Sequence, residues 1–374
     1  MTGAADPASP FKATPGRGEI LVLPGQTPAG EHILSVLLKR SYVIVPGAPC
    51  VRAEGDQPLV AADQPWGNPL NSTVRFESDF VPFKLATDVV LNGRAYAPRG
   101  LPATSFLAAI KIAGHRKDVR VVGDRVGRYL TNGTPVFSDP MPFSVMDLCY
   151  ERAYGGIDVW SDHRLPYPYP RNPLGRGFVV ANTGQGVDQL TLPNLEDPLD
   201  PLTPDRLCVQ DYARWERQPL PSGFGWYPKT SLPRAGFAGI LPADRQTEQE
   251  LRAAYAKLVP AEHRAAYLKH GLPDMDFRFF NGASPGLVLP YLKGDEEIGT
   301  ANLSPDGVLY FRLPGELPKL GLDIGAGVQV PAVVIHTVMI RMEERQVDMV
   351  WRGAVPYPGR DWLPQMRKME VFVQ

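Results

Sequence analysis

The sequence has few cysteines, no long hydrophobic run and no leader-like N-terminus. Its three cysteines, Cys50, Cys149 and Cys208, are odd in number and far apart. That spacing excludes the disulfide framework of small secreted domains and favours reduced thiols in a cytosolic protein. The longest apolar stretch, 328–340, is interrupted by a proline and a histidine, whereas a bilayer span needs roughly 20 apolar residues. We therefore expect no transmembrane segment and no signal peptide.

The sequence also lacks an excess of charge of one sign. It carries 39 Lys and Arg against 40 Asp and Glu, for a formal net charge of −1. Nucleic-acid-binding domains normally carry a basic excess. We therefore expect a cytoplasmic bacterial protein with neither a nucleic-acid partner nor a membrane partner.

Motifs for metals, cofactors and nucleophiles are missing as well. The sequence has no HExxH, CxxC, Walker A or GxSxG pattern, and no GxGxxG after a strand. His263 and His270 are seven residues apart on an expected helix, about 10.5 Å along its axis, too far for one zinc ion. Cys149 lies in an apolar stretch that we interpret as a strand, so we expect a core thiol. We predict no metal, no cofactor and no catalytic residue.

Proline and glycine are abundant and shape the expected fold. There are 40 Pro and 36 Gly in 374 residues, about a fifth of the chain, with 44% hydrophobic and 21% charged residues. This composition is that of a folded protein, but proline at this frequency prevents many long helices. The length allows two domains or one elaborated domain at roughly 150 residues per domain.

Short apolar runs bounded by turn residues predict strands. The segment VLLKRSYVIV (36–45) carries apolar residues in both alternating rows, which indicates a strand buried on both faces. Near the C-terminus, the apolar runs 332–342 and 347–353 are joined by MEERQ, which we interpret as a hairpin turn. The predicted fold class is mainly β (α+β), with antiparallel β-sandwich-like regions, long loops rich in Pro, Gly and aromatic residues, and one short helical pair.

Composition divides the chain into five parts. The middle part is rich in proline and large rings, so we expect ordered loops packed over a core rather than a linker. The helical part has a capping-box spacing at Thr247 and Glu250. The predicted parts are a flexible arm at 1–17, an N-terminal β region at 18–156, a Pro/aromatic-rich loop segment at 157–243, a helical pair at 244–271 and a C-terminal β region at 272–374 that packs on the rest.

Acidic side chains cluster in three places and suggest one alternative function. Paired carboxylates can act as acid and base on a glycoside, so a hydrolase on a β scaffold is conceivable. That hypothesis loses its basis if Asp79, Asp276 and Glu296 prove far apart or salt-bridged. The clusters are Glu77 with Asp79, Asp274 with Asp276, and Asp295 with Glu296 and Glu297.

Two arginines stand beside glycines in short motifs. Arg152 lies in YERAYGG (150–156) and Arg176 in NPLGRGF (172–178). Glycines allow sharp turns that expose an arginine fork, and arginine and aromatic residues are enriched where proteins bind one another. Alternatively, the two arginines pin long loops by pairing with Glu151, Glu196 or Asp276.

A series of motifs in a fixed order resembles one bacterial family over roughly residues 12–355. That family has long been catalogued only as a domain of unknown function and is encoded among type VI secretion genes, beside effectors and PAAR-type spike-tip proteins. Its members are regarded as adaptor chaperones that load an effector onto the spike. The motifs are ESDFVPFKLATDVVLNGRAYAP, VGDR, YERAYGG, NPLGRGF, LPNLE, PSGFG, PDMDFRFFNGAS, LKGDEEI and VWRG.

The resemblance implies a non-catalytic type VI secretion adaptor. Such a protein would bind the N-terminal region of a cognate effector through binding free energy alone. PAAR or spike proteins are further partners that the resemblance suggests. The hydrolase is the alternative, and a structural component secreted with the effector is a weaker one. As candidates for partner contact, or for holding the contact loops, we select Tyr150, Arg152, Arg176, Phe224 and Trp226.

Overall fold

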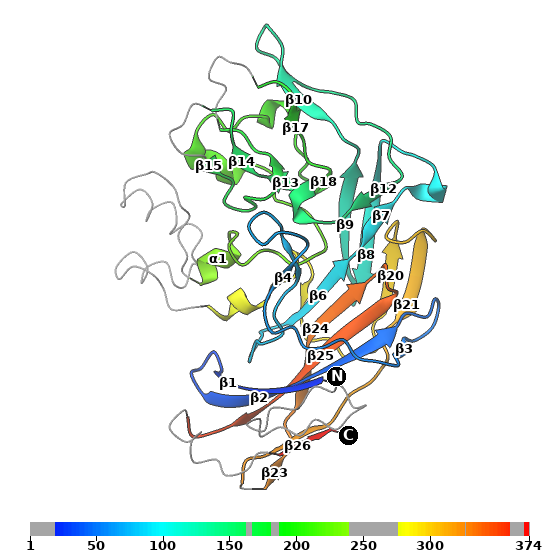
Figure 1. Ribbon diagram of the computed structural model, residues 1–374, viewed down its shortest axis with the longest axis vertical. Helices are drawn as coiled ribbons and strands as arrows, with labels where there is room; N and C mark the ends of the chain where they lie inside the picture. The colour runs from blue at the N-terminus through cyan, green and yellow to red at the C-terminus, as the bar shows by residue number, and fades with distance from the viewer. Residues whose placement is uncertain are drawn as a thin grey trace, which may run out of the picture.

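The structure is a computed structural model that describes residues 19–161, 167–180, 187–238, 276–325, 327–359 and 370–373. Within them the chain is mainly β, as predicted, with two large sheets and several small ones (Figure 1). The flexible arm and the helical pair predicted from the sequence lie outside the described residues.

The larger sheet has seven strands and contains the most deeply buried one. β2 is buried along nearly its whole length, which confirms the strand predicted to be buried on both faces. The turn at 342–345 joins β24 to β25 and confirms the predicted hairpin. In order, the strands are β1 (Glu19–Gln26), β2 (His32–Val43), β25 (Gln346–Pro356), β24 (Val333–Arg341), β6 (Thr87–Asn92) and β19 (Val288–Leu289), with β3 (Val51–Arg52) also paired to β2.

The second large sheet has five strands. Along β8 and β9 the inward side chains are mostly buried, and the outward row contains Leu107 as well as Lys111, Arg116 and Arg120. In order, the strands are β18 (Leu195–Glu196), β9 (His115–Val122), β8 (Ser105–Ile112), β20 (Glu297–Ala301) and β21 (Val308–Arg312).

Strands from the two ends of the chain are interleaved in both large sheets. β2 pairs with β25 along eleven residues, and β8 pairs with β20. The N-terminal and C-terminal β regions delimited from the sequence therefore share the same sheets. Most pairs are antiparallel, as predicted, but β6 and β24 run parallel.

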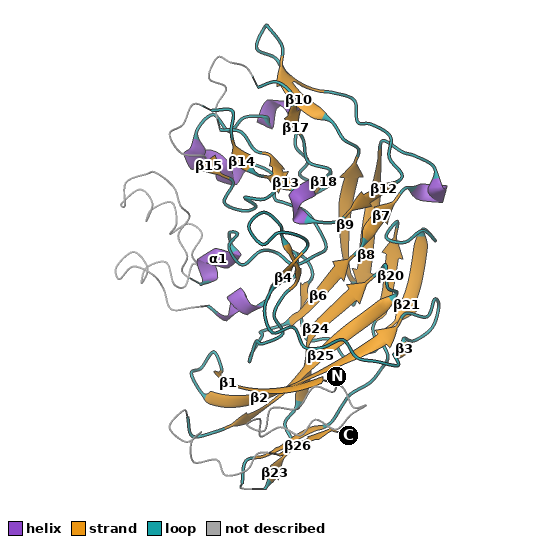
Figure 2. Cartoon of the chain, in the orientation of Figure 1, coloured by secondary structure: helices purple, strands orange, loops and turns teal. Residues whose placement is uncertain are grey.

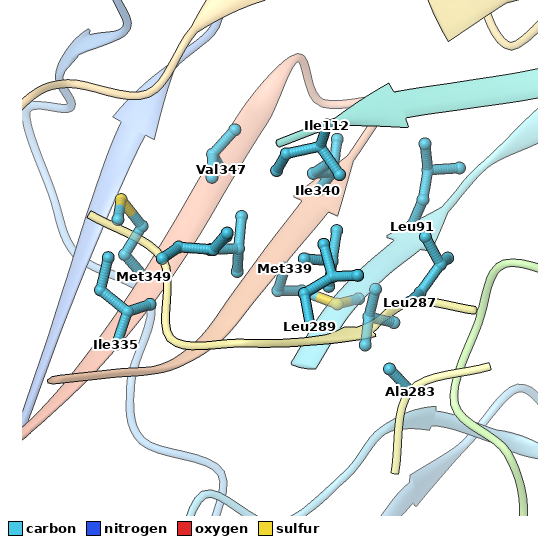
Figure 3. Close-up of a cluster of buried hydrophobic side chains, with 14 of the residues drawn as sticks. Leu91, Ile112, Ala283, Leu287, Leu289, Ile335, Met339, Ile340, Val347 and Met349 are labelled. Atoms are coloured by element: carbon cyan, nitrogen blue, oxygen red, sulfur yellow. The ribbon is translucent and has the colours of Figure 1, made fainter. Parts of the chain in front are cut away.

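One hydrophobic cluster lies between the two large sheets. Ile112 of the five-stranded sheet belongs to the same cluster as Leu91, Ile340 and Val347 of the seven-stranded sheet, and Figure 3 shows these side chains converging. Trp351 on β25 is fully buried there. Apolar burial between the layers, at about 25 cal/mol per Å² removed from water, is the main force that holds them together.

The seven-stranded sheet also buries charged side chains. Lys39 Nζ lies 2.8 Å from Asp79, and Lys84 Nζ lies 2.6 Å from Asp88. Arg341 pairs with Asp348 at 2.8 Å. Buried charges are tolerated only when they are paired and hydrogen-bonded. The two lysine pairs tie the loop that precedes β6 to the sheet, and the Arg341–Asp348 pair links β24 to β25.

The Pro/aromatic-rich segment has a core of its own. Its buried rings include Tyr169 and Phe178, whose centroids are 5.1 Å apart, and Trp215. Other large rings of the segment, Phe224, Trp226 and Tyr227, pack in the central cluster between the two large sheets. Around the segment's own core, the second hydrophobic cluster, lie small sheets: β11 (Pro135–Phe137), β10 (Val126–Tyr129) and β17 (Leu190–Thr191); β13 (Tyr154–Gly155) and β16 (Arg176–Gly177); β14 (Ile157–Asp158) and β15 (Tyr167–Pro168).

The remaining elements are short. Figure 2 shows how little helix the described chain contains, and none of these helices is long and apolar enough to cross a membrane. The other strand pairs are β7 (Arg94–Tyr96) with β12 (Val145–Asp147), β4 (Gln64–Pro65) with β5 (Val74–Phe76), and β22 (Leu320–Asp323) with β23 (Val328–Gln329) and β26 (Glu370–Val373). The helices are α1 (Arg234–Phe237) and the 3-10 turns η1 (Pro98–Gly100), η2 (Tyr150–Arg152), η3 (Pro204–Arg206), η4 (Tyr212–Arg217) and η5 (Phe277–Phe280).

Candidate functional site

The two glycine motifs of the sequence lie against each other. β13 and β16 pair in parallel. The N–H of Arg176 donates to the carbonyl oxygen of Ala153 at 3.0 Å, and the N–H of Phe178 donates to that of Gly155 at 2.9 Å. We call residues 150–156, residues 172–178 and Asn194 the motif junction. It connects the core between the two large sheets to the second hydrophobic cluster.

Glycine is required in the motif junction because the two backbones touch. A Cβ on Gly155, whose φ is +149°, would lie 2.1 Å from the carbonyl oxygen of Asn172. A Cβ on Gly175 would lie 2.6 Å from the carbonyl oxygen of Ala153. Real Cβ contacts are never this close, so these glycines serve close packing of the chain rather than exposure of an arginine.

Both candidate arginines converge on one neutral side chain. Nη1 of Arg152 and Nη1 of Arg176 each donate to Oδ1 of Asn194 at 3.2 Å. Nε of Arg176 donates to the backbone oxygen of Glu151 at 2.9 Å. Burial lowers the pKa of Arg176, and the nearby charge of Arg152 lowers it further. The arginines therefore pin the two motif loops together through an amide.

The structure does not pair either arginine with the carboxylates named in the sequence analysis, Glu151, Glu196 and Asp276. The carboxylate of Glu151 instead accepts from the N–H and the hydroxyl of a threonine, at 2.6 Å each. Glu196 pairs with Arg125, and Asp276 pairs with Arg278 at 2.6 Å. The nearest carboxylate to either arginine among the described ion pairs lies 3.8 Å away.

Tyr150 is a member of a buried hydrogen-bond hub. Its hydroxyl lies 2.7 Å from Oγ of Ser284, which also accepts from Nζ of Lys117 at 2.6 Å. Oγ of Ser284 in turn donates to the carbonyl oxygen of Gly223 at 2.7 Å. Burial raises the pKa of Tyr150 and lowers that of Lys117 to about 8. We call these four residues the Ser284 hub.

Phe224 and Trp226 are also internal. Phe224 is fully buried, and its carbonyl oxygen accepts from the N–H of Leu91 at 2.9 Å. Trp226 is 4% exposed and forms a bridge with Ala283, and Nζ of Lys84 lies 5.2 Å from the centre of its ring. With Tyr150, these aromatic candidates cannot touch a partner directly in this structure. They hold loops.

Sequence reasoning missed three polar residues that organise the site. Asn194 joins the arginines, and its Nδ2 donates to the carbonyl oxygen of Val122 at 3.0 Å. Asn172 donates to two carbonyl oxygens of the first motif loop, and Ser284 centres its hub. Each lies in a recognised motif (LPNLE, NPLGRGF or NGAS) next to proline, glycine or alanine. A buried amide or hydroxyl in a loop motif is the signal that could have identified them.

The sequence profile of one family matches residues 29–352, most of the chain. That family is described as an uncharacterized protein conserved in bacteria (DUF2169). The chain belongs to this family. Neither a curated protein nor a solved structure matches the chain. The resemblance drawn from the motif series is thus confirmed where it names a bacterial family of unknown function.

At least one carboxylate in each acidic cluster of this DUF2169 chain has an internal partner, while Asp274 lies outside the described residues. Asp79 is bound to Lys39, Asp276 to Arg278, and Glu296 accepts from the backbone N–H groups of Lys293 and Gly294 at 2.6 and 2.9 Å. Two of the three carboxylates that motivated the hydrolase hypothesis, Asp79 and Asp276, are therefore salt-bridged.

One small cavity adjoins the first acidic cluster. It measures about 80 Å³ and is lined by Glu77, Asp79, Trp226 and side chains of β24 and β25. Glu77 itself is held by Arg234 at 2.9 Å. The charges around this cavity are therefore neutralised by their neighbours.

Cys149 does not lie in a strand of the DUF2169 fold, which corrects the sequence interpretation. It precedes η2 and is partly exposed. Burial, reinforced by the charge of Glu151, raises the pKa of its thiol to about 12. The thiolate is the reactive form of cysteine, so this thiol stays protonated and unreactive at neutral pH.

Proposed function

We propose that this DUF2169 protein is a non-catalytic type VI secretion adaptor. It binds the N-terminal region of a cognate effector and helps to load that effector onto the PAAR-tipped spike. Binding free energy alone drives the process, and the adaptor acts stoichiometrically in the cytoplasm.

The observation that carries the proposal is the ordered motif series. Its members run from Glu77 to Gly353 and fall almost wholly within the stretch that the family profile matches, 29–352. A series spread over most of the chain is typical of family membership rather than of an isolated motif. The adaptor role is proposed because that series resembles the motifs of the type VI secretion adaptor family.

The placement of the motifs supports a binding module over an enzyme. The motif junction and the Ser284 hub use their polar groups on each other, through the bonds of Asn194, Asn172 and Ser284. Such internal bonds stiffen a framework and lower the entropy lost when it binds a partner. The salt bridges of Asp79 and Asp276 engage two of the carboxylates that motivated the hydrolase alternative, so we do not develop it.

Co-expression with the effector encoded beside this gene tests the proposal. We expect a stable complex on affinity purification and size exclusion, and a larger soluble fraction of the effector. An effector from an unrelated secretion cluster is the matched control and should not co-purify. An effector that is monodisperse alone and indifferent to this protein would contradict the proposal. Recovery of the protein from the culture supernatant with the effector would instead favour a secreted structural component.

A further inference from the structure

β1 is the last strand of the seven-stranded sheet in the described part of the chain. The side to which each backbone N–H and C=O group of β1 points can be worked out from the hydrogen bonds of β2. The N–H of Tyr357 donates to the carbonyl oxygen of His32, and the N–H of Ile44 donates to that of Arg345, so even-numbered residues of β2 bond toward β25. Odd-numbered residues of β2 therefore bond toward β1, because successive residues of a strand alternate.

The register of β1 then shows which of its backbone groups face outward. Leu21 lies opposite Leu37, and Leu23 lies opposite Ser35, so the backbone groups of Leu21 and Leu23 bond to β2. Those of the even-numbered residues Ile20, Val22, Pro24 and Gln26 point away from the sheet. No described residue pairs with that side of β1.

Pro24 agrees with this assignment. A proline cannot donate to a ladder, so it is tolerated where its nitrogen faces the free side of an edge strand. Pro24 occupies such an outward position, while Ile20 and Val22 keep their N–H groups. The outer edge of β1 therefore offers donors and acceptors at Ile20 and Val22 and only an acceptor at Pro24.

The corresponding edge of the five-stranded sheet is covered. Beside β21, the N–H of Gly47 donates to Tyr310 at 2.7 Å, and the N–H of Cys50 donates to Arg312 at 2.8 Å. Arg312 donates back to Ala48 at 3.0 Å. An uncovered edge is a template for another strand, and among the described strands β1 is the longest with such an edge.

We propose that the outer edge of β1 receives an extended segment of the effector by strand addition. This inference rests on the proposed adaptor function. The alternating N–H and C=O groups of an edge are complemented by a second β backbone about 4.8 Å away. Val22 is 7% exposed and packed in the central core, so the edge is fixed in place before binding. Pro24 confines the added ladder to the half of β1 around Ile20 and Val22.

Hydrogen exchange resolved to single amides gives an alternating signature. In the free protein, the amides of Ile20 and Val22 should exchange quickly while those of Leu21 and Leu23 are protected. In the purified effector complex, protection at Ile20 and Val22 should rise at least tenfold. Slow exchange of Val22 in the free protein would overturn the inference. Protection that grows with protein concentration would identify a second copy as the occupant, and protection lost on deleting residues 2–17 would identify the chain's own arm.

Two substitutions at one position isolate the backbone bond. Ile20→Pro removes the outward N–H, whereas Ile20→Ala removes the same side-chain packing and keeps that N–H. We expect Ile20→Pro to weaken effector binding at least tenfold relative to Ile20→Ala, with unchanged circular dichroism. Equal binding by both variants, with wild-type binding intact, would refute strand addition and leave the adaptor function standing. Failure of the wild-type protein to bind the effector would refute both. If Ile20→Pro does not fold, the exchange pattern of the wild-type complex decides.

Discussion

Removing the hydroxyl of Ser284 should destabilise the protein by an amount that the Ser284 hub predicts. In Ser284→Ala, the buried hydroxyl of Tyr150 and the carbonyl oxygen of Gly223 lose their bonds at 2.7 Å. A buried polar group left without a partner costs about 1–3 kcal/mol, so the two groups together should cost about 2–6 kcal/mol. Lys117 retains the carbonyl oxygen of Pro285 as an acceptor, so its charge adds little to that cost.

Equilibrium unfolding in urea, followed by tryptophan fluorescence, measures this cost. Ser105→Ala is the matched control, because Ser105 is an exposed strand serine, and it should change the free energy of unfolding by no more than about 0.5 kcal/mol. Tyr150→Phe removes one bond and should cost about 0.5–1.5 kcal/mol. In the double variant the two losses should not add, because both alter the same bond. A Ser284→Ala variant as stable as Ser105→Ala would refute the view that this hub holds the motif loops.

Two further predictions concern acid stability and the motif junction. His336 is fully buried, and burial, with the charges of Arg352 and Lys84, holds its pKa well below the usual value. Below about pH 6.5 the unfolded chain therefore binds a proton that the folded chain does not. As the pH falls further, this site should lower the free energy of unfolding by about 1.4 kcal/mol for each pH unit. His336→Gln should reduce that slope in urea titrations between pH 5 and 6.5, and an unchanged slope would contradict the assignment. Gly155→Ala should cost more than about 3 kcal/mol or abolish soluble expression, because its Cβ has no room. Gly55→Ala, with nothing within 4 Å, should behave like wild type, and similar losses in both would argue against backbone contact in the motif junction.

The local pattern of apolar and turn residues predicted the strands well, because the alternation of side chains along a strand follows which of its faces are buried. The two apolar rows of 36–45 anticipated the burial of β2 on both faces, and MEERQ anticipated the hairpin between β24 and β25. Both features depend on neighbouring residues alone, through side-chain alternation and turn chemistry. Pairing between β2 and β25 depends on residues some 300 positions apart, and no local pattern encodes it.

The sequence left two roles open for the candidate residues, direct partner contact and the holding of loops, and it could not choose between them. Tyr150, Phe224 and Trp226 are large rings in loop motifs, which is also how interface anchors look in a sequence. Their burial depends on which loops cover them, and that depends on Ser284 and Gly223 from elsewhere in the chain. The arginine partners failed for a related reason, because charge suggested carboxylates while the fold placed a neutral amide between the two guanidinium groups.

By itself the sequence determined that this chain is mainly β, and its motif series identified the family, because side-chain period and motif order are properties of the linear chain. Only the tertiary structure decided which strands are neighbours, which carboxylates are neutralised, and which edge stays open at β1. Those outcomes depend on backbone groups and charges brought together from distant positions, and a hydrogen bond has no signature in the sequence until both of its partners are placed.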